Sequence, residues 1–362
     1  MNSIDKKHIW AQFCSWVVNH RKLLIIIGSI VALLTAAALT YFFVFYKPAS
    51  NQPTPETQLP RVDPPKYHSP LTGMLVNNDA LTKRPVSGVM IENSPEARPQ
   101  SGLSDAGVVF EAICEGGITR FLALYQSERP QLVGPIRSVR MYYIDWAAGF
   151  NASIAHVGGN IDALNEIRNG THRDLDQFSN GDSYWRSNDR WAPHNMYTSF
   201  DNIDAMNAAK GYTSSSFTSF PRIDGAPSAT PTASIINVTI SGPLFDSSYI
   251  YNPTTNNYAR SQAGEPHTDS TGVQITPSVV IAMYVNEYTG ASEEGSEEYI
   301  ATLSSGRAVI FQNGIATEAT WSKSSQTSQI QFTDAAGMPI SLIRGQTWVT
   351  AIPNGNGNAL WQ

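Results

Sequence analysis

A run of 24 uncharged, mostly apolar residues at positions 23–46 constrains this chain more than any other feature of its sequence. As an α-helix rising about 1.5 Å per residue, the run is long enough to cross a hydrocarbon core of about 30 Å. Aromatic side chains gather at its C-terminal end, as they do at membrane interfaces. We therefore predict one transmembrane helix at residues 23–46.

The charges before this run set the orientation that we expect. Residues 1–22 carry four basic side chains against the single acid Asp5, so the positive-inside rule keeps them in the cytoplasm and places the later domains outside. The alternative is a cleaved signal peptide, whose apolar region normally has about 7–15 residues. Because eight further uncharged residues follow Ala36-Ala37-Ala38, we expect an uncleaved, single-pass anchor in the cell membrane.

Charge and cysteine content exclude several classes of function. Of the net charge of −6, residues 1–46 contribute +3, which leaves −9 for the rest of the chain. An acidic extracytoplasmic part argues against a nucleic-acid partner, which requires a basic surface. Cys14 and Cys114 lie on opposite sides of the membrane in this topology and cannot pair within one chain. The sequence shows no metal-ligand spacing, so we expect neither a metal nor a cofactor.

Changes in composition divide the chain beyond the anchor. Residues 47–68 are rich in Pro and polar side chains, which is typical of an extended linker. Residues 69–212 alternate strand and helix patterns, which favours an α+β or α/β domain. Residues 232–353 hold only short β-rich runs, which favours an all-β sandwich or barrel. A Ser/Pro/Thr-rich seam at 213–231 separates the two, and residues 354–362 are expected to form a frayed tail.

Hydrophobic patterning predicts the elements of the first domain. We expect strands at 86–92, 108–114, 118–126 and 153–157, and helices at 141–150, 162–168 and 199–209. Glu115-Gly116-Gly117 is expected to form the turn of a hairpin between the second and third strands. Residues 174–198 are aromatic, polar and aperiodic, which predicts a long functional loop.

Charged side chains within an otherwise apolar stretch, residues 97–159, indicate a candidate site. Burying a charge is costly unless it meets a partner, so we expect this stretch to bring its acids and bases into one solvent-reachable pocket. Together with residues of the long loop, the candidates are Arg98, Glu111, Glu115, Arg120, Arg137, Ser138, Arg140, His156, Arg190, His194 and Asn195.

Three interpretations of these residues stay open. Glu111 and Glu115 resemble a carboxylate pair for acid–base work, but on one strand they would lie about 13 Å apart, beyond the roughly 5–10 Å of glycosidic chemistry. Arg137 and Arg140 could bind an anionic group in bidentate fashion. Alternatively, the arginines pair with the glutamates and with Asp145 to hold the domain together.

Histidines, aromatics and a late acidic run are also open to two interpretations. His156 and His194 could supply acid–base catalysis or structural hydrogen bonds. Trp185, Trp191 and Tyr197 could stack on sugar rings or pin the loop to its domain. A solvated acidic hairpin tip is expected at Glu293, Glu294, Glu297 and Glu298.

Eight ordered segments resemble the YerB-like family of bacterial extracytoplasmic proteins, a domain of unknown function with a separate C-terminal domain. They are SPLTG (69–73), ARPQSGLSDA (97–106), FEAICEGGITRFLALY (110–125), GPIRSVRMYYID (134–145), AHVGG (155–159), RWAPHNMYT (190–198), YARSQAGEPHTD (258–269) and GQTWV (345–349). The resemblance implies a cell-envelope protein with no established reaction or substrate. The family's lipobox cysteine is missing here, and a transmembrane helix takes the place of the lipid.

These observations lead to a functional hypothesis. We expect a membrane-anchored binding or scaffolding module at the cell envelope, with an Arg/Glu/His site for an anionic or glycan ligand. The alternative is an envelope hydrolase or transferase that acts on glycan or lipid-phosphate substrates with the same residues. A third interpretation is an interaction partner of a wall-synthesis enzyme, with the β domain as the docking surface.

Overall fold

The computed structural model describes residues 3–46, 67–292 and 295–362. The chain divides into two compact units, residues 1–63 and 64–362, and each is described by itself. Of the linker expected at 47–68, all but Tyr67 and His68 lie outside the described residues, as do Glu293 and Glu294 of the expected acidic tip.

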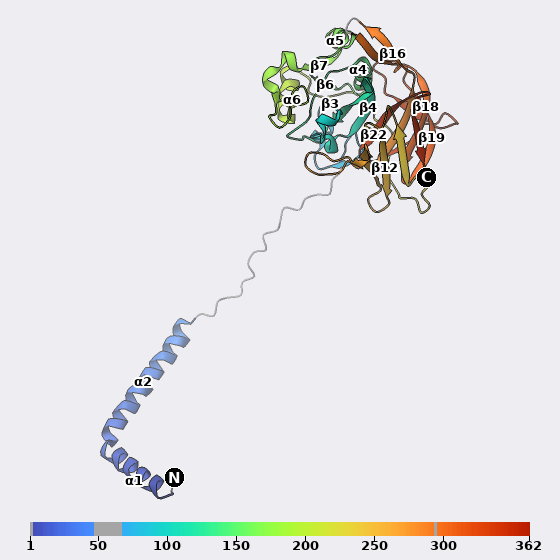
Figure 1. Ribbon diagram of the computed structural model, residues 1–362. Helices are drawn as coiled ribbons and strands as arrows, with labels where there is room; N and C mark the ends of the chain where they lie inside the picture. The colour runs from blue at the N-terminus through green and yellow to red at the C-terminus, as the bar shows by residue number, and fades with distance from the viewer. Residues whose placement is uncertain (1–2, 47–66, 293–294) are drawn as a thin grey trace. The chain divides into compact units, whose positions relative to one another are not determined.

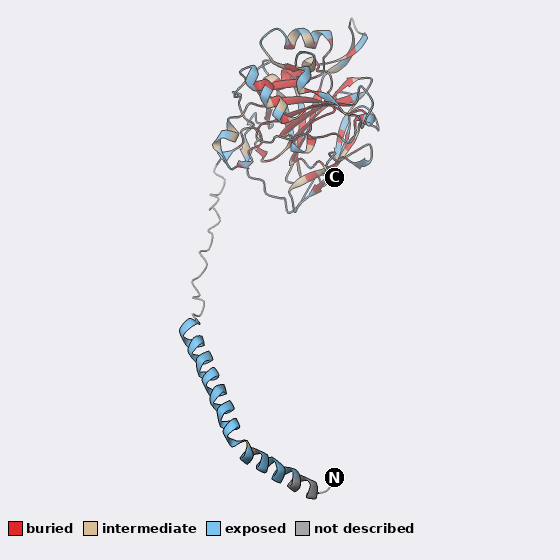
Figure 2. Ribbon diagram, turned by 90° about the vertical axis from the view of Figure 1, so that its left-hand side faces the viewer, coloured by how far each residue is buried: buried red, intermediate tan, exposed pale blue. Residues whose placement is uncertain are grey.

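The first unit contains two helices, α1 (Ser3–Asn19) and α2 (Arg21–Phe45). By its length and its mean hydropathy of 2.5, α2 is apolar enough to cross a membrane, and none of its residues is buried within the unit. Figure 2 shows this exposure along the whole helix. The structure therefore confirms one apolar N-terminal helix at the expected place, whereas the helical state of α1 was not predicted.

The second unit is built on a ten-stranded mixed sheet. From one edge to the other, its strands are β20 (Gln331–Thr333), β19 (Ile315–Ser322), β18 (Ser305–Gln312), β15 (Val279–Val285), β22 (Thr347–Pro353), β4 (Val108–Glu115), β5 (Ile118–Tyr125), β3 (Ser87–Glu92), β6 (Ser153–His156) and β7 (Arg173–Asp176). The C-terminal region supplies the first five strands and the N-terminal region the last five. They meet where β22 runs parallel to β4, with Thr347 opposite Val108 (Figure 1).

Layers cover both faces of this sheet. One face packs against α4 (Met141–Ala148) and α5 (Ile161–Ile167) through a buried cluster that includes Tyr142, Tyr143 and Trp146. The other face packs against α6 (Phe200–Ala209) and a five-stranded sheet of β14 (Glu265–Pro266), β13 (Asn257–Gln262), β12 (Ser247–Asn252), β11 (Ile235–Thr239) and β23 (Asn358–Trp361). Central strands such as β15 are buried on both faces, which explains their uninterrupted apolar sequence.

Short elements complete the second unit. They are β1 (Tyr67–His68), β2 (Leu75–Val76), α3 (Asp79–Thr82), β8 (Trp185–Arg186), β9 (Met196–Tyr197), β10 (Arg222–Ile223), β16 (Glu287–Ser292), β17 (Gly295–Ile300) and β21 (Leu342–Ile343). The mixed α/β N-terminal region and the strand-rich, sandwich-like C-terminal region agree with the expected fold class.

Three local expectations are wrong. The expected tail contains β23, which pairs with β11 and places Leu360 opposite Asn237. The expected loop at 174–198 contains a small hairpin of β8 and β9. Glu297, expected at a solvated tip, is buried, because β17 turns it toward Asn160, whose side-chain amide donates to its carboxylate.

Candidate functional site

A register shift in β4 separates the two glutamates that the sequence places four residues apart. Opposite β5, Ile113 pairs with Thr119, but Glu115 pairs with Ile118, so one extra residue is accommodated between them. Such a bulge turns the following side chain to the other face of the sheet. Glu111 accepts a hydrogen bond from Thr119 on one face, and Glu115 binds Arg120 on the other. The hypothesis of a Glu111–Glu115 carboxylate pair is therefore wrong.

Glu111 is fully buried and binds an arginine that the sequence analysis did not single out. Its Oε2 accepts from Arg260 Nη2 at 2.9 Å and from Trp348 Nε1 at 3.0 Å. Arg260 is itself fully buried, with its guanidinium carbon 4.4 Å from the centre of the Trp348 ring. Strand alternation explains this position, because β13 turns Tyr258, Arg260 and Gln262 inward. The buried charge is thus neutralised by a partner from the other region of the chain.

Hydrogen bonds around Arg260 form a closed circuit with a defined direction. Because an arginine only donates hydrogen bonds, Nδ1 of His267 must accept the bond from Arg260 Nη1. The proton of the neutral imidazole is therefore on Nε2. His267 Nε2 then donates to Gln100 Oε1 at 2.9 Å, and Gln100 Nε2 donates to Asn93 Oδ1 at 3.0 Å. Asn93 Nδ2 donates to Thr119 Oγ1 at 2.7 Å, and that hydroxyl donates back to the buried carboxylate.

We call this circuit the buried polar ring; its members are Asn93, Gln100, Glu111, Thr119, Arg260 and His267. Burial and the neighbouring charges of Arg260 and Arg98 hold the pKa of His267 well below its ordinary value of 6.5. The imidazole is therefore neutral at physiological pH, as the circuit requires. Each of these side chains is buried and takes part in the circuit, which makes the ring a structural joint between the two regions.

On the opposite face, Glu115 joins two of the predicted arginines. Its Oε1 binds Arg120 Nη2 at 2.8 Å and also binds Nη2 of Arg140, the N-cap residue of α4. Arg120 Nη1 donates to the backbone oxygen of Ser138. Glu115 itself remains substantially exposed. This part of the candidate set forms a partly open ion-pair network beside the hairpin end.

Glu92, the last residue of β3, holds a second part of the predicted set. Its Oε1 lies 3.2 Å from Arg137 Nε, 3.0 Å from His194 Nδ1 and 3.2 Å from Ser94 Oγ. A Ser–His–acid triad needs the serine and the acid on different imidazole nitrogens, but here both contact Nδ1 of His194. This trio is therefore not arranged for nucleophilic catalysis. It fixes the positions of Arg137 and His194.

Arg137 is only half engaged by this contact. Its side chain is 25% exposed, and its buried Nε forms an ion pair with Glu92 but no hydrogen bond. Within residues 67–292 and 295–362, its Nη1 and Nη2 form no hydrogen bond. The long loop adds Arg186, which donates to Asn195, and Arg190, which donates to the backbone oxygen of Pro99. Within the same described ranges, neither loop arginine lies within ion-pair distance of a carboxylate.

We call Arg120, Arg137, Arg140, Arg186 and Arg190 the arginine cluster. Burial lowers the pKa of Arg137, the neighbouring charge of Glu92 opposes this shift, and the positive charges of Arg120 and Arg186 add to it. The nearby acids are Glu92, Glu115 and, on the long loop, Asp189. The five arginines therefore exceed these three acids by two positive charges.

His156 does not belong to this cluster. It is fully buried on β6, with Nε2 3.0 Å from Asp174 Oδ1 and Nδ1 2.8 Å from the backbone oxygen of Gly158. Both ring nitrogens are thus occupied and unreachable. The expectation of one pocket shared by Glu111, His156 and the arginines is wrong, because the fold seals the first two into separate contacts. Within the arginine cluster, Arg120 and Arg140 are also buried, and Arg137, Arg186 and Arg190 are at least partly exposed.

Of the loop aromatics, Tyr197 is buried, whereas Trp191 is 90% exposed and Trp185 40% exposed. Tyr197 therefore pins the loop through β9, as one of the two interpretations holds. Trp191 lies on the same turn as His194. The backbone amide of His194 donates to the backbone oxygen of Trp191 at 3.0 Å. An exposed indole thus directly follows Arg190 of the arginine cluster in the sequence.

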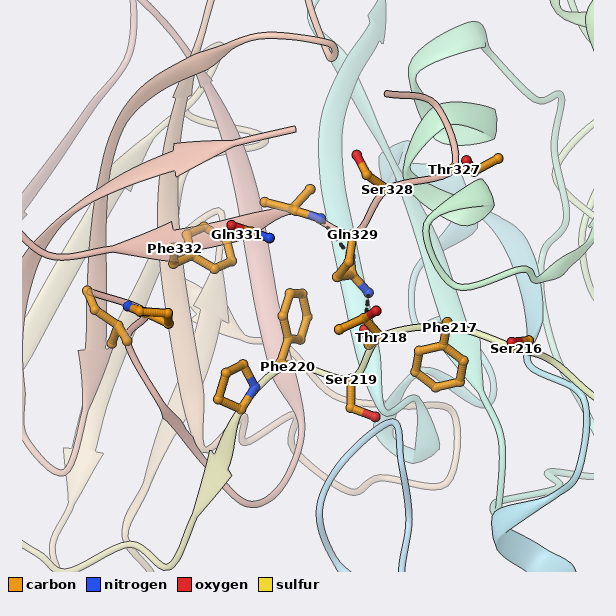
Figure 3. Close-up of a pocket in the computed structure, with 14 residues that line it drawn as sticks. Ser216, Phe217, Thr218, Ser219, Phe220, Thr327, Ser328, Gln329, Gln331 and Phe332 are labelled. Atoms are coloured by element: carbon orange, nitrogen blue, oxygen red, sulfur yellow. Dashed lines mark hydrogen bonds between the residues drawn. The ribbon is translucent and has the colours of Figure 1, made fainter. Parts of the chain in front are cut away.

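The structure contains a hollow of about 510 Å³ that none of the predicted residues lines. Figure 3 shows it between residues 216–221 and 327–332, with the rings of Phe220 and Phe332 side by side and Gln329 donating to the backbone of Thr218. The described side chains around it are uncharged. Across the described residues, no three His, Cys, Asp or Glu side chains form a group that could hold a metal ion.

Sequence reasoning missed Glu92, Arg260 and His267. Arg260 and His267 lie in YARSQAGEPHTD, one of the segments on which the family resemblance rests, and that segment gave the available signal. Glu92 ends a strand that was predicted, but a single terminal glutamate gave no reason to select it.

Fold and site together define a class of protein: an apolar N-terminal helix followed by a unit in which an α/β region and a β-sandwich region share one sheet. Family models match both regions, the "Protein of unknown function (DUF3048) N-terminal domain" at residues 71–213 and the C-terminal domain of the same description at residues 236–349. The chain belongs to this DUF3048, YerB-like family.

YerB of Bacillus subtilis shows the same relationship in sequence and in structure. The chain is 30% identical over 328 residues to "Putative lipoprotein YerB" of Bacillus subtilis (strain 168), which covers 89% of this chain and 95% of that protein. The crystal structure of YerB from Bacillus subtilis superimposes with a TM-score of 0.73 at 29% identity, covering 82% of this chain and all of that one. The lipoprotein description and the apolar helix point to a membrane or envelope protein of unknown function.

Proposed function

We propose that this protein is a membrane-anchored binding protein of the cell envelope that holds an anionic group at the arginine cluster. The observation that carries the proposal is the state of Arg137, whose Nε edge contacts Glu92 while Nη1 and Nη2 stay without partners in the described part of the chain. A guanidinium fixed along one edge presents its remaining N–H donors to a phosphate or a carboxylate.

The neighbouring charges support an anionic ligand. Arg186 and Arg190 bring two more guanidinium groups that have no carboxylate within ion-pair distance among the described residues. An anion at this place would relieve the mutual repulsion of the cluster. Because the site is partly exposed, the attraction should weaken as salt is added. Trp191, nearly fully exposed on the same loop, offers a flat apolar face to a sugar ring that carries the anionic group.

The geometry favours binding over the hydrolase or transferase alternative. Serine and glutamate share one nitrogen of His194, and His156 is sealed. A catalytic base must reach the proton that it removes. The arginine cluster can orient and hold an anion without such a base.

Orientation across the membrane is part of the same proposal. With the basic segment 1–22 in the cytoplasm, α2 spans the membrane once and residues 64–362 stand outside it. Protease added to intact cells stripped of their wall should digest residues 64–362; full protection would contradict this orientation.

The binding proposal is tested with inorganic pyrophosphate as the probe and the full chain in detergent. Arg137→Gln should weaken binding at least tenfold, because it removes the open guanidinium edge while an amide still reaches toward Glu92. The control is Arg307→Gln on β18, which removes an exposed guanidinium that is paired with Glu318. Equal binding by both variants and the natural chain, or no saturable binding at all, would refute the proposal.

A further inference from the structure

A second hollow, of about 350 Å³, lies where the two regions of the second unit meet. Residues 95–99 form one side of it, and residues 262–268 form the other. Its walls include the rings of Pro95, Pro99 and Pro266, which are apolar and rigid. Ligand sites are commonly concave, mostly apolar and equipped with a few polar groups at fixed positions.

Gln262, one of the residues that line this hollow, carries an unpaired side-chain amide. Gln262 is 4% exposed, and its Oε1 accepts from Arg260 Nη1 at 3.0 Å. Because an arginine can only donate, the oxygen must face Arg260, which turns the amide nitrogen away from it. That nitrogen is buried and has no hydrogen-bond partner within the described residues. A buried donor without a partner is destabilising, so an acceptor supplied by a ligand would stabilise it.

Arg98 supplies a second donor and the charge. Its Nε and Nη2 are spent on Asn93 and on the backbone oxygen of Leu244, whereas Nη1 has no partner in the described part of the chain. His267 also lines the hollow but is neutral, with both nitrogens used in the buried polar ring. Among the described residues, Glu265, an exposed residue of β14, is the one acid that lines the hollow. The positive charge of Arg98 thus accompanies the buried donor of Gln262, whereas the negative charge of Glu265 is on an exposed side chain.

We propose that this hollow binds the carboxylate of a small apolar acyl-amino acid, such as the last residue of a peptide chain. Gln262 Nε2 and Arg98 Nη1 donate to the carboxylate oxygens, and the proline rings contact the apolar body. The proposal is independent of the arginine cluster, because neither donor belongs to it.

The test uses the full chain in detergent. The probes are both enantiomers of N-acetylalanine, and N-acetylalaninamide is the uncharged control. Gln262→Glu keeps the acceptor for Arg260 but replaces the donor by a negative oxygen, so it should weaken binding of the better enantiomer at least tenfold. Glu265→Gln removes the acid at an exposed position and should tighten binding about twofold to threefold. The second variant keeps the test decisive even if the first unfolds.

Arg137→Gln separates this proposal from the proposed function. It should leave N-acetylalanine binding unchanged, whatever its effect on pyrophosphate. The proposal is overturned if the amide binds as well as the acid, if Glu265→Gln brings no gain, or if Arg137→Gln abolishes binding. It is also overturned if neither enantiomer binds in a saturable way.

Discussion

At the scale of single residues, the ion pair of Glu111 and Arg260 joins the two regions of the second unit in its interior. Both side chains are fully buried, and they come from strands far apart in sequence. Taking two charges out of water is compensated only when all their hydrogen-bonding capacity is used. The buried polar ring and the Trp348 ring provide those partners. Loss of either charge should therefore cost much more than loss of a surface pair.

We predict that Glu111→Gln lowers the free energy of unfolding by about 3–5 kcal/mol, because it leaves the charge of Arg260 uncompensated in the interior. Glu318→Gln breaks the exposed pair with Arg307 and should cost less than about 1 kcal/mol. Urea unfolding of residues 64–362, followed by circular dichroism, measures both. Equal losses would show that burial does not strengthen the inner pair.

His267 should make stability depend on pH. Its pKa in the folded protein lies well below 6.5, whereas in the unfolded chain it stays near 6.5. Between these values the unfolded state binds more protons, so the free energy of unfolding falls as the pH drops below about 6.5. The slope is at most about 1.4 kcal/mol per pH unit for one proton.

The matched variant is His267→Gln, which can still accept from Arg260 and donate to Gln100 but cannot titrate. The stability difference between the natural chain and this variant should shrink by about 1–2 kcal/mol between pH 7 and pH 5. Urea unfolding at each pH provides the measurement. A difference that stays constant would mean that His267 does not titrate on unfolding.

At the scale of elements, α4 forms hydrogen bonds to the backbone of the hairpin next to the bulge in β4. Tyr142 Oη donates to the backbone oxygen of Ile113 at 2.7 Å, directly before the register shift. Tyr143 Oη donates to the backbone oxygen of Arg120 at 2.8 Å on the partner strand. These two consecutive tyrosines thus bind both strands of the hairpin. The helix holds in place the strands that carry Glu111, Glu115 and Arg120.

We predict that Tyr142→Phe lowers the free energy of unfolding by about 1–3 kcal/mol, because it leaves a buried carbonyl without its donor. Amide hydrogens of β4 and β5 should also exchange faster with solvent. The control is Tyr288→Phe, at a ring that is 62% exposed and stacks on Tyr299. Unchanged exchange in the hairpin of the Tyr142 variant would contradict this role for α4.

Element positions were predictable from the sequence to a greater extent than the site. Strands β3 to β6 and helices α4 to α6 lie within a few residues of their expected ranges, because apolar periodicity and turn glycines act locally. The bulge was not predictable, since nothing in VVFEAICEGG marks where the extra residue sits. That one residue decides whether Glu115 faces Glu111 or Arg140. The partner of Glu111 was equally hidden, because 149 positions separate it from Arg260.

At the scale of the whole molecule, the two regions that the family models describe separately belong to one compact unit. Strand β22 pairs with β4 in the middle of the sheet, and the buried polar ring crosses the same junction. The interior of the unit, seen as the red core of Figure 2, runs across both regions. Cutting the chain between them would expose two long central strand edges.

We therefore predict that residues 64–362 unfold in a single transition, with calorimetric and van't Hoff enthalpies in agreement. Residues 64–231 and 232–362, expressed separately, should not melt cooperatively, because each lacks the partner of its central strand. Differential scanning calorimetry of the three chains provides the measurement. Two transitions in the intact unit, or a cooperative melt of either part, would show independent domains.

We propose that Arg137 keeps an open guanidinium edge for an anionic group outside the membrane. Side-chain NMR of ¹⁵N-arginine-labelled protein observes that edge directly during a titration with pyrophosphate. We predict that the Nη and Nε resonances of Arg137 shift in a saturable way, while those of the buried Arg260 do not move. Shifts that are absent at Arg137, or equal at exposed arginines such as Arg307, would contradict the account.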